Sequence, residues 1–155
     1  MRAEVKSQHM HVYFDNRCLQ RPLDDQTHPR VRVETEAVFV VLVAAQAGHL
    51  SLLGSEALDY EVDRTPDPIR RADVRTVLAL SKEHLTVTDA VELLALDFER
   101  MGVRAMDALH LALSCVYKAD FFVTCDDQLF RKAQTLQNMP CKVSTLLGFV
   151  PEVSP

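Results

Sequence analysis

The sequence predicts one α/β domain in which helices cover both faces of a central parallel sheet. Its length of 155 residues suits a single domain that buries about 68–70% of its unfolded surface. Hydrophobic residues make up 48% of the chain and charged residues 25%, an ordinary globular balance. Short apolar runs alternate with helical patterns, as in parallel sheets whose strands are joined by helices. We expect residues 1–10 to be an N-terminal extension, with Met10 a candidate natural start, and 11–150 to form the domain.

Five apolar runs are predicted as strands because they are short, rich in β-branched or aromatic residues, and bounded by polar residues. These runs lie at 11–14, 50–53, 85–87, 120–124 and 141–143, the last followed by a short turn at 144–147. The first run ends abruptly in Asp15 and Asn16, as expected of a buried strand that ends at the edge of a sheet.

Helices are predicted where apolar residues recur at steps of three and four. Ser55 and Thr88 are suitable N-caps, and Gly48 and Gly102 are suitable helix ends. The predicted helices cover 31–47, 55–65, 67–81, 88–101, 106–118 and 126–137, whereas 17–29, which contains two prolines, is predicted as a loop.

The net charge is -5, with a pI near 5.6, which argues against tight general binding of nucleic acid. Carboxylates that converge on a divalent cation contribute to this total, yet the bound cation reverses the local field. The charge therefore leaves metal-assisted cleavage of a nucleic acid open.

The four cysteines contain no CxxC pair, which favours buried free thiols in a reducing cytosol. They are Cys18, Cys115, Cys125 and Cys141. The first ten residues lack the apolar segment of a signal peptide, and no apolar run approaches the roughly 20 residues of a membrane helix. We expect a cytoplasmic protein that does not enter a membrane.

Three acidic residues are expected at the carboxyl edge of the sheet, where ligands of open α/β folds bind. Asp15 directly follows the first strand, and Asp126 follows the 120–124 strand by two residues. Asp107 lies in the first turn of an otherwise apolar helix, where an unpaired charge is costly. Each alone could be a turn residue, a helix cap or a partner of the helix dipole. Together, without visible basic partners, they favour an oxygen-only site for Mg²⁺ or Mn²⁺.

Several segments resemble the PIN domain family. MDALHLA at 106–112, followed by ADFFVTCDDQL at 119–129, is similar to the family's Asp-Ala-Leu/Ile helix start and its strand ending in Thr-x-Asp-x-x-Leu/Phe. VYFD at 12–15 resembles the family's first strand and first acid, and 55–62 resembles its Ser-containing strand-to-helix junction. The resemblance covers about residues 11–148 and implies a three-layer α/β/α PIN-like fold with a central parallel sheet.

The resemblance also implies a metal site and a catalytic set. It assigns four carboxylates to Mg²⁺ (or Mn²⁺) and adds a threonine whose hydroxyl is hydrogen-bonded within the same pocket: Asp15, Glu61, Asp107, Asp126 and Thr124.

Two departures from the family pattern affect this assignment. Asn16 and Arg17 follow the first acid, where Thr or Ser and then Asn are common. Glu56 competes with Glu61 for the second acid; we prefer Glu61 because of its offset from Ser55 and the aliphatic residue that follows it.

The activity implied is metal-dependent hydrolysis of RNA phosphodiester bonds by an endoribonuclease. Small stand-alone PIN chains resemble VapC-like toxins of type II toxin–antitoxin pairs, which implies a homodimer inhibited by an antitoxin protein. One alternative is a PIN-fold nucleic-acid-binding or regulatory module without catalysis. Another is a Mg²⁺-dependent phosphohydrolase, which would need a second Asp two residues after Asp15, where Arg17 stands.

Other side chains allow two interpretations. His110 could act as a general base, but we favour a core or boundary histidine because a metal can itself generate the nucleophile. Two groups of arginines could follow a phosphate backbone, although a solvated face or local salt bridges is favoured. These groups are Arg64, Arg70, Arg71 and Arg75, and Arg17, Arg21, Arg30 and Arg32.

Overall fold

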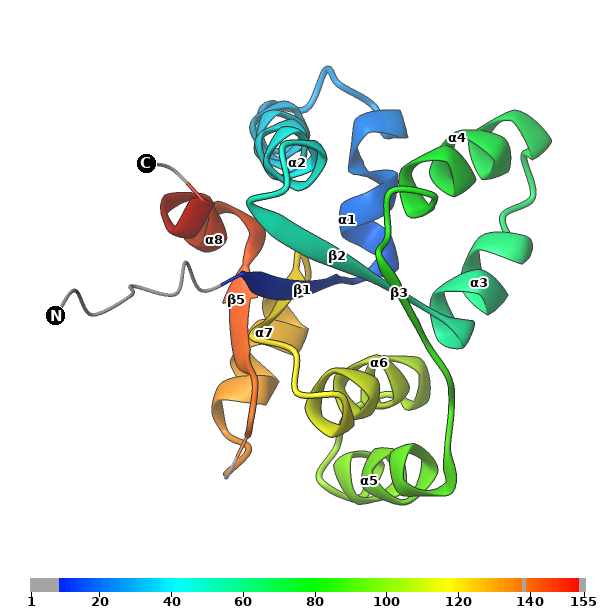
Figure 1. The fold of residues 1–155 in the computed structure, drawn as a ribbon, viewed down its shortest axis with the longest axis vertical. Coiled ribbons are helices and arrows are strands. Elements are labelled where there is room, and N and C mark those ends of the chain that lie inside the picture. Colours follow the sequence, from blue (N-terminus) through cyan, green and yellow to red (C-terminus); the bar gives the residue numbers. More distant parts are fainter. Residues whose placement is uncertain (1–8, 138, 154–155) are drawn as a thin grey trace, which may run out of the picture.

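Residues 9–137 and 139–153 are described by a computed structural model (Figure 1). Most of the expected extension at 1–10 lies outside these residues. The first strand begins at Met10, one residue earlier than expected, and the last helix runs to Val153, three residues past the expected end of the domain.

The strands are β1 (Met10–Phe14), β2 (Leu50–Ser55), β3 (Glu83–Leu85), β4 (Phe121–Thr124) and β5 (Lys142–Thr145). The helices are α1 (Asn16–Gln20), the 3-10 helix η1 (Arg21–Leu23), α2 (Pro29–Gln46), α3 (Glu56–Asp63), α4 (Pro68–Leu78), α5 (Asp89–Arg100), α6 (Ala105–Val116), α7 (Asp127–Gln134) and α8 (Leu146–Val153).

The strands form one five-stranded parallel sheet in the order β3-β2-β1-β4-β5. β1 is central, and Val12 is in register with Leu52 of β2 on one side and Phe121 of β4 on the other. Figure 1 shows α2 and α4 on one side of the sheet and α5 and α6 on the other. The predicted three-layer α/β/α architecture is therefore confirmed.

The core forms where the central strands meet the apolar helix α6. Tyr13 of β1 and Phe122 of β4 are fully buried, with stacked rings 5.6 Å apart. Leu111 and Leu113 of α6 are also fully buried, as expected of a helix that is apolar on most sides. A rigid core thus lies directly beneath the carboxyl edge of the sheet.

Local signals set most helix ends as predicted. The hydroxyl of Ser55 accepts a hydrogen bond from the Leu58 N–H at 3.0 Å, and that of Thr88 accepts one from Val91 at 3.3 Å. Gly48 and Gly102 follow helix ends with φ of 81° and 96°, a left-handed conformation in which a side chain would be strained.

The prediction of a loop at 17–29 is wrong for its first part, which forms α1 and η1. Asp15 caps α1, and the burial of Cys18 and Leu19 stabilises this short turn of helix. Pro22 lies in the first turn of η1, where a missing N–H costs nothing. Such short helices leave no periodic pattern in the sequence.

The predicted turn at 144–147 is also wrong. β5 continues to Thr145, and α8 begins at Leu146, where burial of Leu146 and Phe149 holds the new helix against the domain. The third strand lies two residues earlier than predicted, and α7 ends at Gln134 rather than at 137.

The four cysteines are free and buried, as predicted. None of the helices in the described part of the chain is long and apolar enough to cross a membrane.

Candidate functional site

One pocket of about 200 Å³ is lined by all four carboxylates that the sequence singled out. Its lining consists of Asp15, Asn16, Arg17, Glu61, Arg104, Met106, Asp107, His110 and Asp126. We refer to it as the acidic pocket. Asp15 follows β1 and Asp126 follows β4, so the pocket lies at the carboxyl edge of the sheet.

Asp15 is 5% exposed and is held by hydrogen bonds rather than by a cation. Its Oδ1 accepts the Cys18 N–H at 2.9 Å, and its Oδ2 accepts the Thr124 hydroxyl at 2.5 Å. Burial raises the pKa of Asp15, and the hydrogen bonds from Thr124 and Cys18 oppose that rise. Both carboxylate oxygens are therefore fixed in direction.

Thr124 is fully buried behind the acidic pocket. Its hydroxyl donates to Asp15 and accepts the backbone N–H of Asp126 at 2.9 Å. One hydroxyl thus sets the spacing between the end of β1 and the start of α7.

Asp126 combines a structural role with its place in the acidic pocket. Its Oδ1 caps α7 by accepting the N–H groups of Gln128 at 2.9 Å and Leu129 at 3.2 Å. Its Oδ2 lies 3.2 Å from the Nη1 of Arg17, whose side chain is 63% exposed. One oxygen is used by the helix, and the other faces an exposed cation that can move away.

Asp107 lies in the first turn of α6 and is half-buried. Within residues 9–137 and 139–153 it forms no ion pair. Burial raises the pKa of Asp107, and the nearby charges of Asp15 and Asp126 raise it further. Asp107 therefore carries the part of the pocket's acidity that no ion pair in the described residues offsets, whereas Asp126 faces Arg17.

The structure separates the two candidates for the second acid. Glu61 lines the acidic pocket, whereas Glu56 accepts the backbone N–H of Val87 at 3.0 Å and is not part of the lining. Glu61 stands five residues after Glu56, about 1.4 turns along α3, so the two side chains leave the helix on different faces and that of Glu61 reaches the pocket.

Glu61 is held by a chain of buried polar groups. Its Oε1 contacts the Nε2 of His110, whose Nδ1 lies 2.5 Å from the Tyr13 hydroxyl. That hydroxyl lies 2.7 Å from the Oγ of Ser55, the cap of α3. Every group has a partner if His110 is neutral with its proton on Nε2, Ser55 donates to Tyr13, and Tyr13 donates to His110. His110 is 2% exposed, which agrees with the favoured interpretation of a satisfied boundary histidine.

The donors of the acidic pocket suit a hard divalent cation, because carboxylate oxygens are the ligands that Mg²⁺ and Mn²⁺ prefer. Their present spacing does not form a coordination shell: among the described residues, no group of three or more His, Cys, Asp or Glu side chains is arranged to hold a metal ion. Glu61 faces His110, and Asp126 faces Arg17. Coordination would require the exposed Arg17 side chain to move from Asp126.

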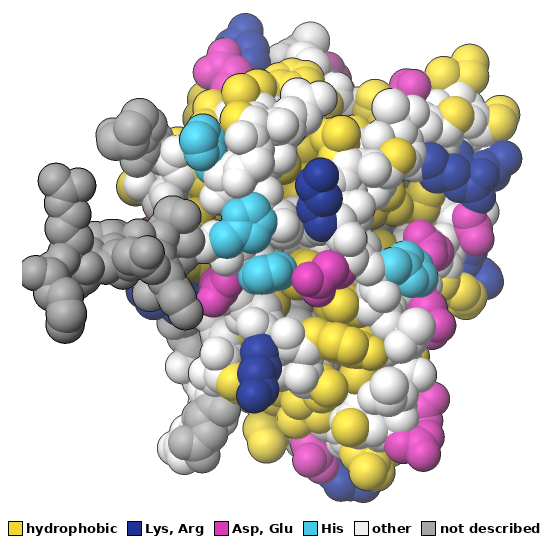
Figure 2. All heavy atoms as spheres, in the orientation of Figure 1, with side chains coloured by type: hydrophobic (Ala, Val, Ile, Leu, Met, Phe, Trp, Pro, Cys, Tyr) yellow, Lys and Arg dark blue, Asp and Glu magenta, His cyan; other side chains and the backbone are white. Residues whose placement is uncertain are grey.

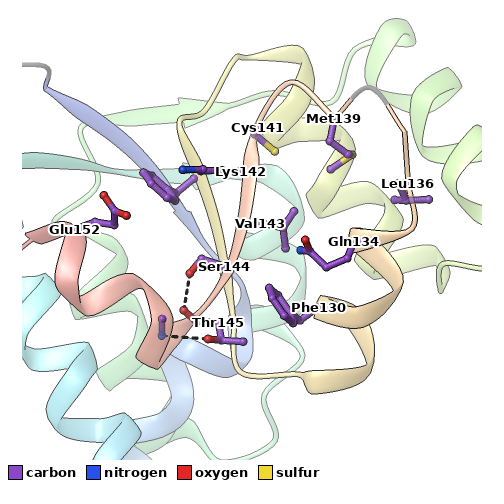
Figure 3. Close-up of a pocket in the computed structure, with 13 residues that line it drawn as sticks. Phe130, Gln134, Leu136, Met139, Cys141, Lys142, Val143, Ser144, Thr145 and Glu152 are labelled. Carbon is purple, nitrogen blue, oxygen red and sulfur yellow. Dashed lines mark hydrogen bonds between the residues drawn. The ribbon is translucent and has the colours of Figure 1, made fainter.

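A larger hollow of about 430 Å³ lies beside β5, between α7 and α8 (Figure 3). Phe130 and Val143 line it, and Glu152 is its one acidic residue. None of the four candidate acids lies there, so size alone does not identify the candidate site.

Most of the arginines that the sequence grouped together form ion pairs within the protein. Arg21 lies 3.0 Å from Glu34, and Arg30 lies 2.8 Å from Asp127. Arg70 pairs with Asp24, and Arg75 pairs with Asp63. Figure 2 shows acidic and basic side chains next to one another over α3 and α4. The local salt-bridge interpretation fits these arginines better than a phosphate-binding one.

Three lining residues were not predicted from the sequence to be part of the site. Asn16 begins α1, Arg104 precedes α6, and Met106 occupies the first turn of α6. Their position in the sequence, close to Asp15 or Asp107, could have identified them. The backbone that brings these carboxylates to the pocket also brings the neighbouring residues there.

The chain matches no family model and no curated protein. Among solved structures it is similar to a chain of VapBC2 from Rickettsia felis, determined as a complex bound to a DNA fragment from their promoter. The TM-score is 0.56 at 11% sequence identity, over 88% of this chain and 98% of that chain. At such low identity the likeness concerns the fold, and the parallel sheet and its helices agree with it. The protein therefore has the PIN-domain fold of the VapC-like type.

Proposed function

We propose that the protein is a Mg²⁺- or Mn²⁺-dependent endoribonuclease. The observation that supports this most is the convergence of Asp15, Glu61, Asp107 and Asp126 on one pocket at the carboxyl edge of the sheet. The raised pKa of Asp107, caused by burial and by Asp15 and Asp126, indicates negative charge that a cation would relieve.

Asp15 and Asp126 are the residues proposed to hold the metal most directly, with Glu61 and Asp107 completing the shell or orienting water. A bound divalent ion would lower the pKa of a water molecule and screen the charge that develops on the scissile phosphate. In-line attack by that water would leave a 5′-phosphate and a 3′-hydroxyl.

The remaining side chains of the pocket would position these carboxylates. The Thr124 hydroxyl keeps one oxygen of Asp15 in place, and His110 does the same for Glu61. Arg17 is free to leave Asp126 because its own side chain is largely exposed. An arginine released in this way can contact a substrate phosphate.

We further propose that the protein is the toxin of a type II toxin–antitoxin pair, acting as a homodimer in the cytoplasm. The similar solved structure is a VapBC2 complex, which supports a partner protein that inhibits this chain. The antitoxin would cover the acidic pocket.

One observation favours a second candidate, a nucleic-acid-binding or regulatory module without catalysis. The Asp126–Arg17 pair neutralises one of the four acids, and the described carboxylates do not form a coordination shell. A Mg²⁺-dependent phosphohydrolase is less well supported, because Arg17 stands where its second carboxylate would be needed.

The test is cleavage of a mixed-sequence single-stranded RNA by the purified protein with Mg²⁺ or Mn²⁺, with EDTA as a control. The Asp15→Asn protein should not cleave. Asp25→Asn is the matched control, because Asp25 is exposed and binds only its own loop at Thr27 and His28. Cleavage that survives both EDTA and Asp15→Asn would rule out the metal-dependent mechanism. Metal binding without cleavage of any RNA would favour the binding module.

A further inference from the structure

A second hollow of about 220 Å³ continues the acidic pocket towards α7. It is lined by Gly102, Val103, Arg104, Asp107, Asp126, Gln128, Leu129 and Lys132. Arg104, Asp107 and Asp126 line both hollows, so the two lie side by side, and we describe them together as one cleft. We call the part beyond Asp107 and Asp126 the α7 arm of the cleft.

The α7 arm differs from the acidic pocket in charge. It adds Lys132 and shares Arg104, and neither side chain forms an ion pair within residues 9–137 and 139–153. Most arginines that the sequence grouped together, in contrast, pair with carboxylates of the protein. The α7 arm therefore presents cations whose charge is available to a ligand.

The backbone at Gly102 leaves room for the side chain of Lys132. It is only partly exposed, and its Nζ lies 2.9 Å from the position that a Cβ on residue 102 would occupy. Gly102 leaves that space open and has a φ of 96°, which disfavours any side chain there. The ammonium group thus lies over the turn that leads into α6, close to the start of the acidic pocket.

The floor of the α7 arm is apolar and rigid, because Val103 and Leu129 are each 5% exposed. Gln128 is exposed at the rim and offers amide hydrogen bonds. A floor without charge and a wall with two cations suit an extended anionic chain. A phosphodiester backbone that placed one phosphate among the carboxylates and their metal would continue into this arm.

We propose that the α7 arm is a substrate-binding subsite for the RNA backbone next to the scissile phosphate, with Arg104 and Lys132 contacting phosphate oxygens. This proposal rests on the proposed ribonuclease function. The guanidinium of Arg104 can bind a phosphate through two parallel hydrogen bonds, whereas Lys132 supplies a compact charge. These contacts bind any sequence equally, because phosphates carry no base identity.

The test is fluorescence anisotropy of a labelled single-stranded RNA bound to the full chain carrying Asp15→Asn, which keeps the strand intact, in Mg²⁺ at several salt concentrations. In that background Lys132→Ala and Arg104→Ala should each raise the Kd about 3- to 10-fold. Each should also reduce the slope of log Kd against log salt by about 0.7, the value for one single-strand phosphate contact.

The matched control is Lys142→Ala, which removes a positive charge from β5, in the hollow beside α7 and α8. Its Kd should change less than about 2-fold, with an unaltered slope. Lys132→Arg should keep most of the affinity, and melting temperatures confirm that each variant is folded. Equal effects of Lys132→Ala and Lys142→Ala would overturn the subsite, as would an RNA that does not bind at all.

These outcomes are separable from failure of the proposed function. If the wild-type chain cleaves RNA while Lys132→Ala and Lys142→Ala bind RNA equally well, the ribonuclease function is supported and the subsite is contradicted. If the wild-type chain does not cleave RNA, yet Lys132→Ala weakens RNA binding and Lys142→Ala does not, the subsite is supported and the protein is an RNA-binding module.

Discussion

Two regions of the described structure hold buried carboxylates, and the partners of these carboxylates differ: basic side chains in one region and neutral hydrogen-bond donors in the other. In the arginine network (Arg21, Arg30 and Arg70 with Asp24 and Glu34), Glu34 is 2% exposed and faces the guanidinium groups of Arg21 and Arg30. In the acidic pocket, Asp15 is 5% exposed and accepts hydrogen bonds from the Thr124 hydroxyl and the Cys18 N–H, and no arginine or lysine of the described residues pairs with it. Glu34 is thus already paired with cations of the protein, whereas Asp15 relies on neutral hydrogen-bond donors, which is the arrangement on which the proposed metal site rests.

The pKa shifts of two aspartates express the same contrast. The hydrogen bond from Arg30 holds the pKa of Asp127 below its usual value. Burial, together with Asp15 and Asp126, raises the pKa of Asp107. The two residues are of one chemical type, and their surroundings alone decide the direction.

The sharpest test of this contrast uses neighbouring acids. Asp126→Asn should lower RNA cleavage on the order of 10²–10³-fold, because under the proposed function it removes a carboxylate that would hold the metal. Asp127→Asn should change cleavage less than about 2-fold, since Asp127 is exposed and pairs with Arg30. Single-turnover cleavage rates at saturating Mg²⁺ check both, and similar losses in the two variants would contradict the distinction.

A change in the other region, the arginine network, should affect stability rather than cleavage. Glu34→Ala leaves Arg21 and Arg30 without their shared carboxylate, and we expect a loss of about 3 kcal/mol in the free energy of unfolding. Cleavage by the folded fraction should remain near that of the wild type. Urea unfolding, followed by circular dichroism, measures the first quantity. A stable variant with poor cleavage would place Glu34 in the functional site instead.

A smaller effect is expected behind the acidic pocket. Tyr13→Phe keeps the ring stacked on Phe122 but removes the hydroxyl that joins Ser55 to His110. The affinity for Mn²⁺ should fall about 10-fold, as for other residues that orient a ligand from behind. The ¹⁵N shifts of His110 should also lose the signature of a single Nε2–H tautomer. Unchanged shifts would show that Tyr13 does not fix this histidine.

The smallest expected effect concerns stability and pH. The raised pKa of Asp107 means that the folded protein favours the protonated acid. The associated stability is fully present below the unfolded pKa of about 3.9 and is lost as pH rises through the folded value. Asp107→Asn should therefore raise the metal-free melting temperature by roughly 1–3 °C at pH 7. The gain should vanish near pH 3.5. A lower melting temperature at pH 7 would mean that the charge of Asp107 is compensated.

The sequence revealed the features whose causes are local. Ser55 and Thr88 each accept an N–H three residues later, so their type and spacing predict the helix starts. The alternation of apolar strands with amphipathic helices likewise predicted the three layers. All four acids line one pocket because their positions meet at a single edge of the sheet. Asp15 and Asp126 follow strands, and Asp107 and Glu61 lie in helices next to that edge.

What the sequence did not reveal depends on distant partners. Arg17 and Asp126, or Arg30 and Asp127, are far apart in the chain, so no local pattern predicts their pairing. Glu56 does not line the pocket and instead accepts a hydrogen bond from Val87, in the segment between β3 and α5. α1 was missed because its five residues, held by Asp15 and by burial, are too short for a periodic signal.

The strand order also bears on how the protein is made. β1 lies at the centre of the sheet, and its Asp15 is fixed by Thr124, which is 109 residues further along the chain. A ribosome releases the N-terminal part of a chain first, so Asp15 emerges long before β4 is made. The acidic pocket therefore cannot be assembled before β4 and the start of α7 have been synthesised. A cell producing this protein would meet the complete pocket only after that point, so the proposed antitoxin, if made beforehand, would have time to be in place.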